Sequence, residues 1–570
     1  YMASAGLSYQ ILDWLNVAGR VRIDNTHSEY EGKLYASSSN TLTDGSSQGH
    51  YTVNNGQYSQ TYADVLVNIN KRIQDFTIVA NIGASYSGVT SKELGYAGPI
   101  RETGIPNLFN VYDLDNAKKR ATQVGWREAT ESIFASAEVG WKSMLYLTVT
   151  GRNDWASQLT HSPQASFFYP SVGLSAVITE MLKLPDWVDY LKVRGAFSSV
   201  GNPYPRFLTY PTYSYDANKQ DWKSQTNYPI GKLYPERTDS WEVGLDATLF
   251  KDFKLSGSFY YANTYNQTFD PRLPVSSGYD KLYVQTGYVR NYGFEAMLSY
   301  GHRWGDFGWD SSFTFSANKN EIVELVKDYV HPETGKTYNV DKLELKTDEG
   351  RGFGKAKFIL KEGGTLGDLY THADLKRDIN GNILIDDSGN VTAIDNAGDI
   401  KLGSVLPKAN LAWNNSFSYK GINAGFLLTA RLGGIVYSAT QAYLDLYGVS
   451  ETSAAARDAG GVWINGRSRV NPQSFYEVVA SQSGLPTYYT YSATNLRLQE
   501  AHIGYTVPRR WLGNVCDINV SLVGRNLWMI YCKAPFDPEA VATTNNYYQG
   551  IDYFMMPSTR NIGFNIKINF

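Results

Sequence analysis

The sequence lacks the features that mark several common classes of protein. No run of apolar residues approaches the ~18 that a membrane-spanning helix needs, and the mean hydropathy of −0.35 is too polar for a bundle of such helices. The 52 basic and 55 acidic residues are interspersed rather than grouped. Because nucleic-acid binding would need a basic stripe, we expect no nucleic-acid partner.

Cysteine is also scarce, since Cys516 and Cys532 are the only two. They bracket one predicted strand, and that length of extended chain separates their Cα atoms by roughly 50 Å. A disulfide needs a separation of about 7 Å or less. We therefore expect two unpaired thiols.

No group of residues assembles a catalytic centre or a cofactor site. The one Gly-x-Ser-x-Gly match, Gly45 to Gly49, lies in a polar loop, whereas a nucleophile elbow needs a strand before the serine and a helix after it. A partial phosphate-loop match at Gly335 fails because Val330 stands where the first glycine is required. The seven histidines are scattered, with no pair at metal-ligand spacing. We expect no catalytic residues, no cofactor and no enzyme activity.

Aromatic residues and glycine are abundant, with 43 Tyr, 13 Trp and 51 Gly among 570 residues. A chain of this length exceeds one ordinary soluble domain, so it forms either several domains or one very large sheet. A transmembrane barrel hides its hydrophobicity in alternation, so a polar average with many aromatics favours the large sheet.

The alternation is clearest at the C-terminus, where polar residues or glycine separate five apolar ones: Ile562, Phe564, Ile566, Ile568 and Phe570. Such a strand has one face for an apolar medium and one for water. A half-buried edge strand of a soluble sheet is the alternative. The closing strand of an outer-membrane barrel fits better, because the aromatic last residue lies on the apolar face.

The same pattern returns as hairpins along the whole chain, with tight turns predicted at Gln74-Asp75, Lys142-Ser143, Lys251-Asp252 and 420–423. We count about 17 strands of about 10 to 14 residues, beginning near Ala5, which suits tilted membrane-spanning strands. Strands of sandwiches are nearer 5 or 6 residues. The predicted fold class is all-β, a transmembrane antiparallel β-barrel.

Long polar loops alternate with the tight turns, at 27–58, 89–129, 202–236, 321–408 and 437–494. Bacterial barrels have short periplasmic turns and long external loops, so Phe570 is expected on the periplasmic side. Because side chains alternate between the two faces of a strand, each residue's position along its strand then predicts whether it faces the lumen. A register slip of one residue would invert each assignment. The lumen-facing candidates are Glu138, Arg152, Glu242, Asp246, Arg431 and Lys567.

The long loops supply the candidate binding residues. Their aromatic rings can stack on sugars or pack on peptides, although an interfacial girdle and loop packing are the alternative roles. The candidates for cargo contact are Tyr204, Tyr213, Trp222, Tyr443, Tyr447, Trp463 and Tyr489. Weak calcium candidates are Asp378, Asn380, Asn382 and Asp386. Because the twelve-residue calcium loop with its closing Glu is absent, we favour Asn-Gly and Ser-Gly hairpin turns there and expect no metal.

Nine short motifs occur in order across nearly the whole chain. They are Arg152-Asn153-Asp154-Trp155, 168–175, 191–194 running to 200–203, 235–238 with 241–245, 403–407, 495–498, 504–508, Arg525-Asn526-Leu527 and Phe536-Asp537-Pro538-Glu539. With these motifs and the Phe570 ending, the sequence resembles the barrel of SusC/RagA-type TonB-dependent outer-membrane transporters.

The resemblance implies a barrel of about 22 strands with an N-terminal plug, of which residues 1–570 would be the C-terminal part. The plug, the TonB-contacting segment and the first strands are then expected upstream, as is the signal peptide that an exported barrel needs. An open sheet of about 17 strands would leave unpaired edges in lipid, which is not tolerated. The implied partners are a SusD-like lipoprotein over the external loops, TonB with ExbB and ExbD, and the lipid of a Gram-negative outer membrane.

The implied function is active import of large nutrients, either oligosaccharides and glycans or oligopeptides. A passive porin is one alternative, and a surface receptor or adhesin without transport is another. No residue in the sequence chooses between glycan and peptide cargo.

Overall fold

The computed structural model describes residues 1–208, 213–216, 221–224, 227–228, 233–269, 279, 281–330, 335, 337–345, 354–542 and 549–569. Phe570, the last residue of the predicted closing strand, lies outside this described part. Seventeen strands form one sheet, and the pairings described for it are antiparallel. No helix in the described part of the chain is long and apolar enough to cross a membrane.

The chain divides into two compact units. Unit 1 comprises Tyr1–Leu174, Ala196–Asp239 and Thr268–Gln285, and unit 2 comprises Ser175–Gly195, Ser240–Gln267 and Thr286–Phe570. Strands β7 (Phe167–Val177), β8 (Val188–Asn202) and β12 (Glu236–Leu249) contribute residues to both units, as do the ends of β13 (Phe253–Phe269) and β15 (Val284–Trp304) at 268–269 and 284–285.

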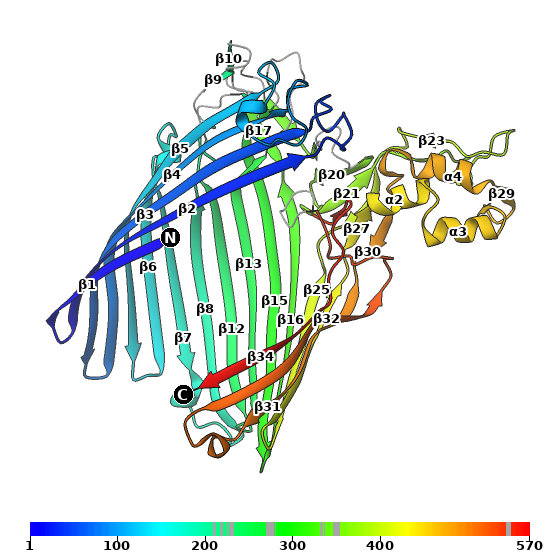
Figure 1. Cartoon of the computed structure of the whole chain (residues 1–570). Helices are drawn as coiled ribbons and strands as arrows, with labels where there is room; N and C mark the ends of the chain where they lie inside the picture. The colour runs from blue at the N-terminus through cyan, green and yellow to red at the C-terminus, as the bar shows by residue number, and fades with distance from the viewer. Residues whose placement is uncertain are drawn as a thin grey trace. The chain divides into compact units, whose positions relative to one another are not determined.

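Unit 1 is built on a meander in which each strand pairs with the next (Figure 1, blue to cyan). Its strands are β1 (Met2–Leu12), β2 (Leu15–Leu34), β3 (His50–Ile73), β4 (Phe76–Pro99), β5 (Arg120–Trp141) and β6 (Leu145–Ala156). The turn predicted at Gln74-Asp75 joins β3 to β4, with Gln74 at a φ of 50°. Short elements occupy the loops: η1 (Val111–Asp113), η2 (Ser157–Leu159), β9 (Tyr213–Asp216), β10 (Asp221–Ser224), β11 (Asn227–Tyr228) and β14 (Lys281–Leu282).

Unit 2 continues the same meander pattern (Figure 1, green to red). Its long strands are β13 (Phe253–Phe269), β15 (Val284–Trp304), β16 (Phe307–Glu324), β25 (Ala409–Tyr419), β26 (Ile422–Leu432), β31 (Asn495–Val507), β32 (Asp517–Cys532) and β34 (Asn561–Asn569). Two short elements, α1 (Ile178–Met181) and η5 (Arg509–Leu512), lie in its tight connections.

Both long loops of unit 2 carry structure of their own. The loop after β16 contains β17 (Val326–Val330), β18 (Thr337–Val340), β19 (Lys342–Leu345), β20 (Ala356–Lys361), β21 (Asp368–Thr371), β22 (Asp374–Leu375), β23 (Ala393–Ile394) and β24 (Ile400–Ser404). The loop after β26 contains β27 (Ile435–Ser438), α2 (Ala439–Leu446), α3 (Glu451–Asp458), β28 (Val462–Ile464), β29 (Ser468–Val470), α4 (Pro472–Val479), η4 (Ser481–Ser483) and β30 (Thr490–Ser492). Strand β33 (Ile551–Asp552) adds to β27 in parallel.

Most predicted boundaries hold, but two loops are shorter than expected. The sequence predicted loops at 27–58 and 89–129, whereas the connections run only from 35 to 49 and from 100 to 119. Strands β3 and β4 reach 24 residues each, longer than the predicted spans. Their outer ends are rich in Tyr, Ser, Thr and Gly. The alternation of apolar with polar residues is lost where both faces of a strand meet water. The sequence pattern therefore does not show that β3 and β4 continue through these ends.

One face of the strands is apolar and exposed, and the other is polar. Apolar side chains lie beside one another on neighbouring strands, for example Val65 with Ala84 and Ile133, and Leu522 with Phe564. The fully buried apolar side chains concentrate elsewhere, in the loops: Leu325, Phe358, Ile359, Leu360, Leu369 and Tyr437. A membrane-facing sheet accounts for this distribution, because lipid rather than protein covers its apolar face.

A lysine placed on either face of β34 tests this assignment. Phe564 is 78% exposed on the apolar face, so Phe564→Lys should place an ammonium in lipid at about 2 to 4 kcal/mol and strongly reduce the folded protein recovered from membranes. Asn565→Lys, one residue further on the polar face, should fold normally. Equal recovery of the two variants, measured by protease resistance of membrane fractions, would contradict the assignment.

Candidate functional site

The polar face of unit 1 carries a band of paired charges. Arg20 on β2 donates two hydrogen bonds to the Asp64 carboxylate on β3, at 3.0 and 2.8 Å. Arg152 on β6 donates to Asp154 at 2.6 Å and to Ser132 on β5 at 2.8 Å. The Tyr169 hydroxyl donates to the same Asp154 carboxylate. Period-two geometry produces the band, because these side chains occupy the same face of adjacent strands.

The polar face of unit 2 has an equivalent cluster. The Arg194 guanidinium lies 3.1 Å from both the Glu242 and the Asp246 carboxylates, and Ser256 donates to Asp246 at 2.7 Å. A cavity of about 770 Å³ opens on this face. Hydroxyl, amide and charged side chains line it, including Ser258, Glu295, Thr314, Asn410, Arg431 and Gln499.

All six predicted lumen-facing residues lie on these polar faces. Arg152, Glu242 and Asp246 belong to the charge clusters, and Glu138 accepts a hydrogen bond from Thr148 at 3.1 Å. Arg431 donates to the Val405 carbonyl at 2.7 Å. Lys567 stands opposite Asn519 in the register of β34 with β32. Their function in a translocation path remains a prediction.

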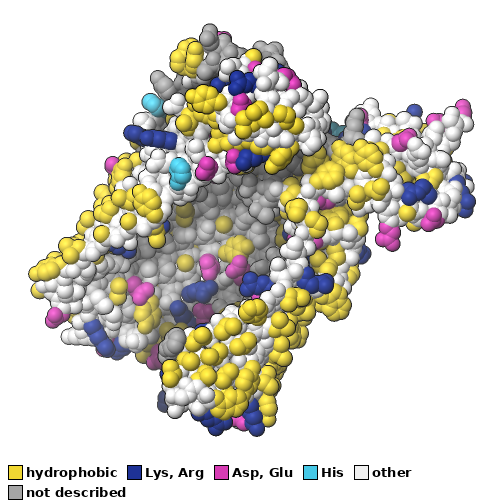
Figure 2. All heavy atoms as spheres, in the orientation of Figure 1, with side chains coloured by type: hydrophobic (Ala, Val, Ile, Leu, Met, Phe, Trp, Pro, Cys, Tyr) yellow, Lys and Arg dark blue, Asp and Glu magenta, His cyan; other side chains and the backbone are white. Residues whose placement is uncertain are grey.

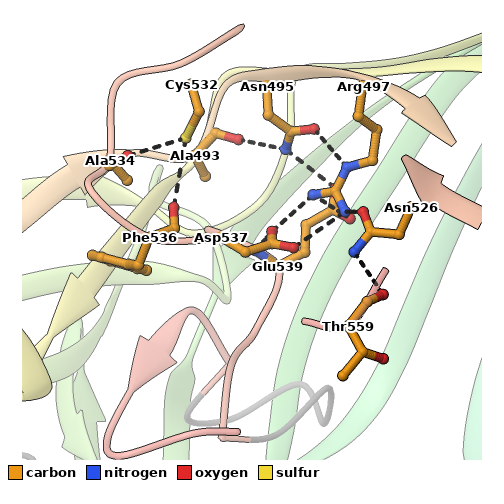
Figure 3. A network of polar contacts seen from close by, with 10 residues as sticks. All are labelled: Ala493, Asn495, Arg497, Asn526, Cys532, Ala534, Phe536, Asp537, Glu539 and Thr559. Carbon is orange, nitrogen blue, oxygen red and sulfur yellow. Dashed lines mark hydrogen bonds and ion pairs between the residues drawn. The ribbon is translucent and has the colours of Figure 1, made fainter. Parts of the chain in front are cut away.

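A buried polar network of unit 2 centres on Arg497, which is 5% exposed (Figure 3). Its guanidinium reaches Asp537 at 2.8 and 3.2 Å and Glu539 at 3.2 Å. Asn495 donates to Glu539 at 3.2 Å, and Asn526 donates to the Thr559 carbonyl at 3.2 Å. The network therefore fastens the connection between β32 and β34 to strand β31.

The Arg497 network sets the pKa of Asp537. Burial by itself would raise the pKa of this carboxyl, but hydrogen bonds from the Arg497 guanidinium and the Glu539 backbone N–H outweigh it and lower the pKa below the ordinary value. Sequence reasoning identified the motifs that contain these residues but did not identify their contact, because about 40 residues separate Arg497 from Asp537. The available sequence signal for this contact was Arg497 itself, an arginine in a strand with an otherwise alternating pattern.

The predicted cargo-contact residues divide into exposed and buried groups. Tyr213 and Trp222 lie on the two-stranded hairpin β9–β10, where Trp222 stands opposite Tyr215 with ring centroids 5.3 Å apart. In unit 2, the rings of Tyr443 and Phe554 have centroids 5.4 Å apart, and Tyr447 is exposed. Trp463 is also exposed, and the Arg469 guanidinium carbon lies 4.5 Å from the centroid of its ring. Tyr215 was not among the predicted contacts, although its alternation with Tyr213 places both rings on one side of the hairpin.

Tyr204 and Tyr489 differ from the expectation, because each is only 2% exposed. The Tyr489 hydroxyl donates to Asp445 at 3.0 Å, and burial raises its pKa well above the ordinary value. Both rings support the internal packing of their loops, so cargo would reach them only if those loops opened. Alternation in sequence gives no information on which loop aromatics turn inward.

The weak calcium candidates form two consecutive hairpin turns. The Asp378 carboxylate accepts the backbone N–H groups of Asn380 and Asn382, each at 2.8 Å, and Asp386 accepts those of Ser388 and Asn390 at 2.9 and 2.8 Å. Gly381 and Gly389 complete the turns with φ angles of 85° and 81°. The side-chain amide of Asn382, together with these backbone N–H groups, lowers the pKa of Asp378. No cluster of three or more His, Cys, Asp or Glu side chains suited to a metal occurs among the described residues. Both cysteines are free thiols.

Comparison with known proteins identifies the family of the chain. Residues 1–527 match the family described as TonB dependent receptor-like, beta-barrel. The chain belongs to this family. Its members are receptors and transporters of Gram-negative outer membranes, and the predicted resemblance to SusC/RagA-type barrels is confirmed.

Two relatives from the same family show how much of each sequence is shared. The chain is 24% identical over 524 residues to TonB-dependent receptor P3 of Formosa agariphila, covering 85% of this chain and 50% of that protein. It is 24% identical over 433 residues to TonB-dependent receptor SusC of Bacteroides thetaiotaomicron, covering 70% of this chain and 40% of SusC. The chain thus spans half or less of the length of these relatives.

A solved structure supports the same fold. The RagAB peptide transporter superposes with a TM-score of 0.75 at 16% identity, covering 100% of this chain and 62% of that one. The same importer in its open-open state gives a TM-score of 0.72 at 17% identity. At these identities the likeness establishes the β-barrel fold of the TonB-dependent receptors and leaves the cargo open.

The Arg497 network predicts a large difference between two arginine substitutions. Arg497→Gln leaves the buried Asp537 carboxylate without its cation, which should lower the free energy of unfolding by about 3 to 5 kcal/mol. Arg525→Gln removes an ion pair to Glu500 whose arginine is 68% exposed, so the expected change is about 0 to 1 kcal/mol. Guanidinium unfolding of the detergent-purified protein measures both, and similar midpoints would show that the network is not stabilising.

The lowered pKa of Asp537 predicts an acid-sensitive connection. Stability from a carboxyl with a depressed folded-state pKa is present above its unfolded value, about 3.9, and is lost as the pH falls through the folded value. We expect the 533–560 connection to become protease-sensitive only below about pH 4, when the Arg497–Asp537 pair is lost. Asp537→Asn should be cleaved at every pH, and a wild-type profile in this variant would contradict the assignment.

Proposed function

We propose that the chain forms the barrel wall of an outer-membrane importer for large nutrients. Membership in the TonB-dependent receptor family supports this proposal, as does one structural observation. That observation is the division of the long strands into an apolar face and a polar face, on which Arg20 pairs with Asp64 and Arg194 with Glu242 and Asp246. A wall of this kind meets lipid on one side and a hydrated path on the other.

Energy in this proposal comes from the inner membrane through TonB with ExbB and ExbD. A plug supplied by sequence upstream of the described chain closes the path until it is displaced. A SusD-like lipoprotein covers the long loops, and the helical insertion after β26 offers it an extensive surface. Similarity to SusC and to the RagAB peptide transporter supports these assignments.

The proposed orientation places the tight turns in the periplasm and the structured loops outside the cell. The polar faces then form the lumen, with Arg152, Glu242 and Asp246 along the path. Cargo is an oligosaccharide, a glycan or an oligopeptide. Exposed rings on the β9–β10 hairpin are the proposed first contacts, because flat amphipathic rings bind either class of polymer while facing water.

Uptake by the full-length protein in its host tests the proposal. Accumulation of labelled oligosaccharides or oligopeptides should require the gene and should stop when a protonophore removes the inner-membrane gradient. A porin would continue to conduct in purified form and would ignore the protonophore. A surface receptor or adhesin would bind ligand while uptake stayed unchanged on deletion of the gene.

The aromatic hairpin gives a residue-level prediction. Tyr213→Ala with Trp222→Ala removes two exposed rings worth about 0.5 to 1.5 kcal/mol each, so the half-saturating cargo concentration should rise by roughly tenfold while the maximal rate changes little. Trp511→Ala, which removes an exposed ring from the tight turn between β31 and β32, is the matched control. Unchanged half-saturation in the hairpin variant would remove this hairpin from the cargo path.

A further inference from the structure

The membrane-facing side of unit 2 carries an unusual group of tyrosines and cations near its structured loops. On β13, β15 and β16, which are neighbours in the sheet (Figure 1), the group contains Tyr261, Tyr265, Tyr288, Arg290, Tyr292 and Lys319. We call this group the tyrosine patch. It lies at the ends of these strands that are remote from the tight turn at 305–306.

Register places the patch on the outer face. Tyr260 and Asn318 share the opposite, polar face, because the Tyr260 hydroxyl donates to Asn318 at 3.1 Å. Tyr261 and Lys319 are the next residues on their strands, so they point to the apolar side. Tyr292 stands opposite Lys319, and Arg290 stands opposite Glu321, in the pairing of β15 with β16.

The height of the patch along the strands corresponds to a membrane interface. Trp304 lies beside the tight turn on the same face of β15, about 12 residues from Tyr292, which is roughly 40 Å along the strand. With the usual strand tilt of about 35 to 45°, the two rings are about 30 Å apart along the membrane normal, close to the ~25 Å apolar band of such barrels. Phe294 and Phe315, with ring centroids 6.3 Å apart, lie in this interval.

Tyrosine rings hold both cations of the patch in place. The Arg290 guanidinium lies 5.5 Å from the ring centroids of Tyr261 and Tyr288, and the Lys319 ammonium lies 5.5 Å from that of Tyr292. The rings themselves stack in pairs, Tyr265 with Tyr288 at 4.9 Å and Tyr261 with Tyr292 at 6.3 Å. Cations fixed over aromatic faces are oriented in advance of binding, which reduces the ordering cost of a ligand.

The charges of the patch are incompletely neutralised. Among the described residues, the ion pair of its cations is that of Arg290 Nη1 with Glu321, at 3.8 Å, so the two cations of the patch face one carboxylate there. Arg290 Nη2 donates to the Tyr288 hydroxyl at 3.0 Å, while the buried Arg290 Nε has no hydrogen-bond partner among the described residues. The Arg290 side chain as a whole remains 28% exposed, so its guanidinium is open to an anionic acceptor, and the fork of an arginine matches phosphate oxygens.

We propose that the tyrosine patch binds the phosphate-bearing headgroup of an outer-leaflet glycolipid. Arg290 and Lys319 contact the phosphate, and the tyrosines pack against the sugar and the upper acyl chains at the interface. The inference rests on the proposed membrane location, and it concerns a face of the wall that cargo does not meet. Bound lipid would anchor the rim of the barrel beneath its structured loops.

Binding of lipid A to the detergent-purified full-length protein tests the proposal. Native mass spectrometry should detect a complex with phosphorylated lipid A and at least tenfold weaker binding of lipid A from which the phosphates have been removed. Arg290→Gln with Lys319→Gln should weaken the phosphorylated complex at least tenfold. Arg290→Lys with Lys319→Arg, which keeps both charges, should retain most of the binding and shows whether the fold tolerates change at these positions.

A matched control removes two cations from β13 and β15, two of the three patch strands, at the other end and on the other face. Lys254→Gln with Arg303→Gln alters β13 and β15 near the tight turns, so binding of phosphorylated lipid A should be unchanged. Three outcomes would each overturn the proposal. They are equal binding of both lipid forms, equal binding of phosphorylated lipid A by the Gln variant and the wild type, and displacement of bound lipid A by millimolar inorganic phosphate. Because the assay contains no cargo, failure of import in the uptake experiment leaves its result interpretable.

Discussion

The structure depends on one constraint, which is that backbone N–H and C=O groups facing lipid must pair with a neighbouring strand. A meander satisfies the constraint locally, since each long strand pairs with the next one along the chain. Strand geometry then sends alternate side chains to opposite faces. The apolar face can be covered by lipid, whereas the polar face can be solvated by water. Lateral pairs such as Arg20–Asp64 and Arg194–Glu242 join neighbouring strands on the polar face.

The same constraint explains where the protein places its buried apolar residues. A sheet that turns its apolar side chains to lipid has few left for a core of its own. The cores therefore form in the long loops, around Phe358 and Leu369 in one insertion and around Tyr437 in the other. The two insertions consequently behave as small folded layers attached to strand ends, with caps and turns typical of soluble proteins. Ser438 and Ser450, for example, cap α2 and α3 through their side chains.

Much of this fold could be predicted from alternation alone, because period two is visible wherever one face meets lipid. The alternation indicates the number of strands and the position of the tight turns. It also places Glu242 and Lys567 on the polar face. Alternation fails at the outer halves of β3 and β4, where both faces are polar, and inside the loops. Tyr489 and Tyr447 illustrate the second failure: both are loop tyrosines, yet one is buried against Asp445 and the other is exposed. Tertiary contacts decided these orientations, and no periodicity encodes them.

Six of the nine motifs that carry the family resemblance interact with one another in three pairs. Asp154 of one motif accepts from Tyr169 of the next, Arg194 pairs with Glu242, and Arg497 pairs with Asp537. Each pair joins adjacent strands, or a strand to a loop above it, on the polar face. Lipid-facing positions require only an apolar side chain, so they can vary freely among Val, Ile, Leu and Phe. Each of these paired charges on the polar face instead requires a specific partner at a specific register. This difference gives a physical reason why a few short motifs, widely spaced in sequence, identify the family when overall identity to P3 is only 24%.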